Sequence, residues 1–176
     1  MLVARNMETE VTIQFPYTAE TFAPAYRVNL RRKKTSYLLP VFGAGLIALN
    51  LYIVFTGPEN WALPVLGFLA GGMCLFQNRI AVHNSCRWMK KNKSYGDTIT
   101  ARFSPQGVTS SSSGTDGSMS WDKILSATFC REGVLLFTHE GIFHFAPRNA
   151  FANEEDFGAV KTMIADAGVK IEKVGR

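Results

Sequence analysis

Residues 37–55 read YLLPVFGAGLIALNLYIVF, a stretch of 19 residues without a charged side chain. A second apolar stretch, WALPVLGFLAGGMCLF, covers residues 61–76, and the chain stays uncharged as far as Asn78. An α-helix needs about 20 mainly apolar residues to cross a hydrocarbon layer of ~30 Å. The two stretches therefore predict a hairpin of two transmembrane helices, joined by a turn at residues 56–60 that is too short to hold a domain.

The positive charge of the chain is concentrated beside these stretches. Basic residues, Arg27 and Arg79 among them, precede the first stretch and follow the second, whereas the connecting turn contains no Lys or Arg. By the positive-inside rule both flanks lie in the cytoplasm. The net charge of +5 is thus explained by membrane topology, and we expect no nucleic-acid partner. The expected membrane-surface contacts are Arg31, Arg32, Lys33, Lys34, Arg87, Lys90 and Lys91.

Small residues recur at a spacing of four in both apolar stretches. Gly67 and Gly71 form a GxxxG pair, and Ala44 and Ala48 form a similar pair of small residues. Such faces allow the backbones of membrane helices to approach closely. They could join the two helices, a homodimer or a partner. Asn50, a strongly polar residue deep in the first stretch, is expected to bond across to the second helix.

The chain before the hairpin predicts one strand and one helix. Apolar residues alternate over residues 11–15 (VTIQF), as in a half-buried strand. Thr18 or Thr21 could then cap a helix that ends in the basic residues. This strand lies on the same side of the membrane as the C-terminal part of the chain. We therefore expect that it can join the C-terminal sheet, which would make a domain split by its own anchor.

Strands separated by short turns dominate the chain beyond Tyr95. Alternating apolar residues predict strands near residues 99–103, 125–129, 134–138 and 142–146, separated by turn signals. These signals are Gln106-Gly107, Asp116-Gly117, Glu132-Gly133 and Glu140-Gly141. Asn153, followed by three acidic residues, is a typical helix start, and Gly168 a typical helix stop. Antiparallel hairpins followed by one C-terminal helix are thus expected.

This order of elements is the pattern of pleckstrin-homology (PH)-like domains, and three local motifs add to it. They are Gly107-Val108 after a strand, WDKI at residues 121–124, and FAPRNAF at residues 145–151 before the acidic helix start. Together with the upstream hairpin they resemble the YcxB-like family of bacterial membrane proteins. The resemblance implies a cytosolic PH-like C-terminal domain and a place in the inner membrane. The residues that carry the family motif, mainly as core anchors, are Trp121, Pro147, Arg148 and Phe151.

The expected fold is therefore a membrane α-hairpin plus an α+β cytosolic domain, whose antiparallel PH-like sheet is capped by a C-terminal helix. Residues 1–35 form the N-terminal strand and helix, and residues 36–80 the two-helix transmembrane hairpin. Residues 81–94 form a basic juxtamembrane linker, and residues 95–176 the YcxB-like domain. Both termini are expected in the cytoplasm.

The sequence contains no motif typical of catalysis. His139-Glu140-Gly141-Ile142-Phe143-His144 resembles a zinc-protease motif, but its second His is one residue too far along and the segment predicts a hairpin. No phosphate-binding or dinucleotide-binding loop occurs. We therefore predict no enzyme activity, no cofactor and no metal. The alternative is a membrane-bound enzyme that acts on lipids through His139, His144 and an acidic residue.

The predicted function is that of a non-enzymatic inner-membrane protein. Its PH-like domain would bind a protein, a peptide or a lipid headgroup at the cytoplasmic face. The expected partners are membrane lipids and a membrane protein, with a homodimer left open. A role as accessory subunit of a membrane complex is a variant of the same prediction.

Overall fold

The computed structural model describes residues 10–33, 35–57 and 60–172, which form two units. The helical unit comprises Tyr26–Arg87, and the sheet unit combines Met1–Ala25 with Trp88–Arg176. Helix α1 (Ala19–Arg32) begins in the sheet unit and ends in the helical unit. It starts after Thr18, whose hydroxyl accepts a hydrogen bond from the Thr21 N–H (3.4 Å), so Thr18 supplies the predicted cap.

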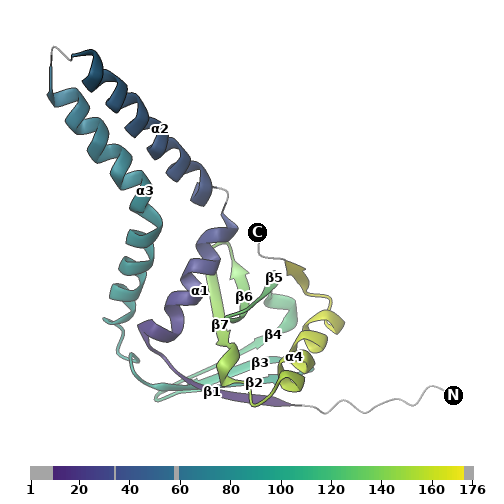
Figure 1. Cartoon of the computed structure of the whole chain (residues 1–176). Coiled ribbons are helices and arrows are strands. Elements are labelled where there is room, and N and C mark those ends of the chain that lie inside the picture. The colour runs from purple at the N-terminus through teal and green to yellow at the C-terminus, as the bar shows by residue number, and fades with distance from the viewer. Residues whose placement is uncertain (1–9, 34, 58–59, 173–176) are drawn as a thin grey trace. The chain divides into compact units, whose positions relative to one another are not determined.

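Two long apolar helices make up most of the helical unit. Helix α2 (Thr35–Thr56) and helix α3 (Ala62–Met89) run side by side as a hairpin (Figure 1). Helix α2 ends just before Gly57, and Pro64 lies in the first turn of α3, where its missing N–H costs little. Both helices are long and apolar enough to cross a membrane. Helix α3 also continues without a break through residues 81–89, the first part of the predicted linker.

Small and polar residues at a spacing of seven form the contact between α2 and α3. On α2 the buried residues are Ser36, Gly43 and Asn50, and on α3 they are Pro64 and Gly71. A Cβ atom on Gly43 would lie 2.7 Å from the Gly71 carbonyl oxygen, so the two backbones touch. A spacing of seven keeps one face of a helix against its neighbour over several turns.

One expectation about this contact is corrected, and one alternative is narrowed. Gly67 and Gly71 face α2, whereas Ala44 and Ala48 are exposed, which leaves this second pair for a homodimer or a partner. The Asn50 side chain lies against Gly67, yet its Nδ2 donates to the Leu46 carbonyl on its own helix (2.7 Å). An amide beside a glycine can turn back to the nearest free carbonyl lone pair. It thereby satisfies one donor without a partner on α3.

The first sheet of the sheet unit has the strand order β1-β2-β3-β4. Strand β1 (Val11–Pro16) pairs with β2 (Thr98–Ser104) in antiparallel register, with Ile13 opposite Ala101. Alternate residues of β1 are buried, as the sequence pattern predicts. The expected pairing of the N-terminal strand with the C-terminal strands is therefore confirmed.

The hairpin between β3 (Gly107–Ser112) and β4 (Thr115–Ser120) turns three residues earlier than expected. Asp116 and Gly117 lie inside β4, and the turn consists of Ser113 and Gly114. Gly114 has φ +106°, which a two-residue hairpin turn favours and which glycine adopts most easily. The prediction of a turn at Asp116-Gly117 is wrong, because Gly114 supplies the positive φ that the turn requires.

The second sheet has the strand order β7-β6-β5-β8. Strands β5 (Ser126–Cys130), β6 (Gly133–His139) and β7 (Ile142–Pro147) form the two predicted antiparallel hairpins. The last strand, β8 (Lys170–Glu172), runs parallel to β5 and was not expected. Strand β5 is thus an inner strand. Consecutive residues Ser126, Ala127 and Thr128 are all buried there, in place of the predicted alternation.

Helix α4 (Glu154–Asp166) follows the second sheet and is linked to both sheets by aromatic side chains. Its cap is confirmed, since the Asn153 side chain accepts from the Asp156 N–H (2.7 Å). Phe157 of α4 contacts Phe129 of β5 and Phe151, whose ring in turn lies 6.1 Å from that of Phe103 in β2. At the other end, Phe22 of α1 joins Phe15 of β1 to Phe145 of β7.

Replacing Ile13 of β1 tests whether this strand belongs to the core of the sheet unit. Ile13 is 2% exposed, whereas its neighbour Gln14 is exposed. Ile13→Ala should lower the free energy of unfolding by about 2–5 kcal/mol through lost burial and a cavity. Urea unfolding can be followed by the fluorescence of buried Trp121 in a chain with Trp61 and Trp88 replaced by Phe. Gln14→Ala is the control, and an equal, small effect of both variants would contradict the pairing.

A pair of glycines on α2 tests the hairpin contact. A Cβ at Gly43 would meet α3 at 2.7 Å, whereas a Cβ at Gly45 would have nothing within 4 Å. Gly43→Ala should therefore destabilise the helices by about 1–3 kcal/mol through overpacking. Gly45→Ala should leave them unchanged or slightly more stable, because alanine favours helices. Thermal unfolding in one detergent, followed by circular dichroism, compares the two. Equal midpoints would show that α2 and α3 do not meet at Gly43.

Candidate functional site

Most of the predicted membrane-surface residues are exposed. In the helical unit Arg31, Lys33 and Arg87 are exposed and Arg32 is half-buried. In the sheet unit Lys90 and Lys91 are exposed, and Lys91 lies 4.6 Å above the ring of Trp88. Lys34 falls outside the described residues. The structure places these residues at helix ends but does not gather all of them at one site.

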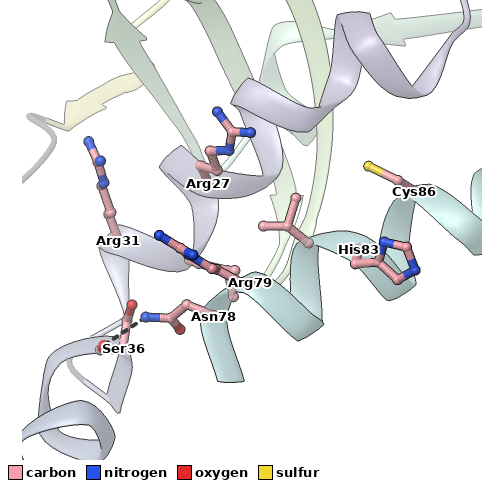
Figure 2. Close-up of a pocket in the computed structure, with 9 residues that line it drawn as sticks. Arg27, Arg31, Ser36, Asn78, Arg79, His83 and Cys86 are labelled. Atoms are coloured by element: carbon pink, nitrogen blue, oxygen red, sulfur yellow. Dashed lines mark hydrogen bonds between the residues drawn. The ribbon is translucent and has the colours of Figure 1, made fainter. Parts of the chain in front are cut away.

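A smaller group of cations does line one pocket of the helical unit, of about 730 Å³ (Figure 2). Arg27, Leu30 and Arg31 come from α1. Spacings of three and four residues place them on one face of that helix. Arg79, Val82, His83 and Cys86 come from one face of α3 for the same reason. We call this site, defined by Arg27, Arg31, Arg79 and His83, the arginine pocket.

A hydrogen bond between the two long helices borders the arginine pocket. The Asn78 side chain donates from Nδ2 to the carbonyl oxygen of Ser36 (3.0 Å), as the dashed line in Figure 2 shows. Ser36 is buried at the start of α2, and both residues line the pocket. This bond holds the first turn of α2 against α3. Arg79, the next residue after Asn78, is thereby fixed at a defined height beside α2.

The electrostatics of the arginine pocket are one-sided. Among the residues that the structure describes, its lining contains three arginines and one histidine but no carboxylate. Within the described part of the chain, no carboxylate oxygen lies within 4.0 Å of Arg27, Arg31 or Arg79. Arg79 is 6.0 Å from the ring of Phe76, which is a weak cation–π contact at most. Guanidinium groups without a protein counter-ion are suited to binding a phosphate or carboxylate through paired hydrogen bonds.

The basic residues of the arginine pocket were recognised in the sequence, but the sequence did not predict that they line one pocket. Arg27, Arg31 and Arg79 all belong to the basic flanks of the hairpin. Their grouping depends on how α1 and α3 lie within the helical unit, which no local pattern reveals. The signal that could have found it is the spacing of four from Arg27 to Arg31 and from Arg79 to His83, which aligns each pair on a helix face.

The family-motif residues have structural roles in the sheet unit. Trp121 is buried at the end of the first sheet, and its indole N–H donates to the Ser104 carbonyl (3.0 Å). Pro147 ends β7 and begins a short 3-10 turn over Arg148–Ala150. Phe151 follows this turn and is buried. The motif therefore fixes the route of the chain from the second sheet into α4.

Arg148 is held by α4 and is not a free cation. Its guanidinium donates to both carboxylate oxygens of Glu154 (3.1 and 2.5 Å) and lies 4.8 Å from the ring of Phe157. These hydrogen bonds to the Glu154 carboxylate raise the pKa of Arg148 above its usual value. Arg148 thus ties the 3-10 turn to the first turn of α4. A headgroup could bind it only in competition with this carboxylate.

The two histidines of the alternative hypothesis lie on different rungs of the β6–β7 ladder. His139 is opposite Ile142, and His144 is opposite Leu136. Neither imidazole has a hydrogen-bond or ion-pair partner among the residues that the structure describes. In the same residues no group of three or more His, Cys, Asp and Glu is placed to hold a metal ion.

Comparison with known proteins bears on the C-terminal part of the chain. Residues 103–164, from β2 to α4, match the family model described as YcxB-like protein. They include Trp121, Pro147, Arg148 and Phe151, which carry the resemblance in the sequence. No curated protein and no solved structure matches the chain. The family match confirms the resemblance to the YcxB-like family over residues 103–164.

Proposed function

We propose that this chain is a non-enzymatic protein of the bacterial inner membrane that presents a PH-like interaction domain at the cytoplasmic face. The observation that carries this proposal is the outward-facing apolar surface of α2 and α3. Large side chains point away from the hairpin contact along both helices, with Phe55 86% and Leu69 62% exposed. A helix that is apolar all round requires either a protein core or hydrocarbon around it. Hydrocarbon accounts for this exposure.

The pairing of β1 with β2 supports a topology with both ends in the cytoplasm. These strands flank the hairpin in the sequence, so the chain must leave the sheet unit and return to the same side. The basic residues lie on that side, and residues 56–60 at the other end contain no Lys or Arg. The positive-inside rule then gives the cytoplasm as the side of the sheet unit.

The YcxB-like segment supports a PH-like assignment for the sheet unit. Two largely antiparallel sheets precede one C-terminal helix, which is the order that the family resemblance implies. Strand β1 and the parallel strand β8 extend the sheets at their edges. In this proposal the domain binds a protein, a peptide or a lipid headgroup. The proposal assigns it no catalytic role.

Anchoring gives such a domain a physical advantage. A module held at the membrane meets other membrane-bound molecules at a high effective concentration, so weak intrinsic affinity is sufficient. Two large apolar side chains at one end of the second sheet are candidates for contact with a protein. Ile142 is 59% exposed beside the end of β6, and Leu125 is exposed on the other side of β6.

A second candidate is an accessory subunit of a membrane complex. Ala44 and Ala48 are exposed on α2, on a face that α3 does not use. A neighbouring membrane helix could pack closely against these small residues. The same face would serve a homodimer, so oligomeric state separates the two forms of the proposal.

Site-specific photo-crosslinking in native membranes tests the interaction role. A photoreactive residue at Ile142 should give one adduct of defined mass, because an apolar side chain on an interaction surface lies against the partner. The same residue at exposed Glu155 of α4 is the control and should give none. Dilution in detergent should weaken the Ile142 adduct by about tenfold or more as the tethering is lost. Identical labelling from both positions, or none from either, would contradict the proposal.

A further inference from the structure

We infer that the arginine pocket binds the phosphate of an anionic ligand, with the headgroup of an anionic phospholipid as the expected source. This inference deepens the proposed function and rests on its membrane anchor. Arg27 and Arg31 from α1 and Arg79 from α3 line one space (Figure 2), and no carboxylate of the described part of the chain lines it with them. Like charges that share a pocket repel one another, and an anion between them removes this repulsion.

The chemistry of the lining fits a phosphate better than a single carboxylate. Each guanidinium presents a planar fork of N–H donors that matches two oxygens of a phosphate. Three such groups from two helices line the pocket and can contribute donors to one anion. His83 adds a ring nitrogen that can donate a further hydrogen bond. The pocket volume of about 730 Å³ leaves space beside the phosphate for the polar part of a larger ligand.

The level of the pocket favours a phospholipid as the source of this phosphate. Ser36 and Asn78, which line the pocket, mark the ends of the uncharged stretches of α2 and α3. In the proposed insertion, the pocket therefore opens where hydrocarbon gives way to headgroups. Leu30 and Val82 add apolar surface to the lining. Basic pockets between membrane helices on the cytoplasmic side are suited to anionic headgroups.

Lipid binding to the full-length protein tests the inference with two matched variants. The pocket variant carries Arg27→Gln, Arg31→Gln and Arg79→Gln. The control variant carries Lys93→Gln, Lys123→Gln and Arg131→Gln, three exposed basic residues outside the pocket lining and outside the expected membrane-surface contacts. Both variants lose the same charge, so a diffuse electrostatic effect would appear equally in both. All six substituted side chains are exposed, so we expect both variants to fold. Circular dichroism and size-exclusion chromatography check this.

Native mass spectrometry of delipidated protein measures the binding of phosphatidylglycerol and, for comparison, phosphatidylcholine. The wild type should bind phosphatidylglycerol at least about tenfold more tightly than phosphatidylcholine, because only the former carries a net negative charge. The pocket variant should lose at least about tenfold in affinity for phosphatidylglycerol, and the control variant no more than about twofold. A single Arg79→Gln variant should show an intermediate loss. Equal losses in the pocket and control variants, or no loss in the pocket variant, would overturn the inference.

Inorganic phosphate separates the two sources of the anion. Competition by phosphate against phosphatidylglycerol in the wild type, absent in the pocket variant, supports phosphate recognition. Tight binding of phosphate with no preference for phosphatidylglycerol would overturn the lipid as the source. Carbonate extraction of the same variants reports on the membrane anchor separately. All of them should stay in the membrane pellet, and their release would contradict the proposed function, whatever the pocket binds.

Discussion

The antiparallel pairing of β1 with β2 is the constraint on which the rest of the structure depends. One strand comes before the two long helices and the other comes after them, yet six residue pairs join them. The sheet unit can form only when the chain has passed through both helices and returned. The helices must therefore make a hairpin whose two ends lie on one side. Closing so large a loop costs entropy, and the burial of alternate β1 residues offsets that cost.

The two units bury opposite kinds of side chain, which supports the proposal that a membrane surrounds the helical unit. In the sheet unit the core consists of large apolar residues such as Ile13, Phe103 and Leu135. Among the described side chains of residues 36–87, the buried ones are all small or polar, and most of the large apolar ones are exposed. Such an inverted arrangement would be costly in water. It is stable where the surroundings are as apolar as the side chains, since packing then favours small residues between helices. The buried residues of this second group are Ser36, Gly43, Asn50, Pro64 and Gly71.

Signals within one element were sufficient to predict much of the fold. The uncharged stretches gave the two long helices, alternation gave β1, and Asn153 with Gly168 gave the limits of α4. The failures came where a choice depended on contacts distant in sequence. Strand β8 is short and mostly exposed, and only its place beside β5 makes it a strand. A glycine was available at either of two turn positions in the β3–β4 hairpin, and the register of the sheet selected Gly114.

The contact between α2 and α3 and the arginine pocket also depend on residues that are distant in sequence. A spacing of four drew attention to Ala44 and Ala48, but the repeat of seven from Ser36 through Gly43 to Asn50 was already present in the sequence. That repeat predicts a longer and more continuous contact. The arginine pocket needed more, because its cations lie far apart in the sequence and meet only through the arrangement of α1 and α3. From the sequence, these cations were recognised only as part of the basic segments that flank the hairpin.

In the proposed insertion hydrocarbon surrounds the outward faces of α2 and α3, and this can be measured at Leu69. A spin label at a Leu69→Cys substitution can be studied in liposomes, in a chain whose three native cysteines are replaced by alanine. Molecular oxygen concentrates in hydrocarbon, whereas a nickel chelate stays in water. We expect strong relaxation of the label by oxygen and little by the chelate. Relaxation mainly by the chelate, or weak relaxation by both, would place Leu69 in water or in a protein core and rule out insertion of this face in a membrane.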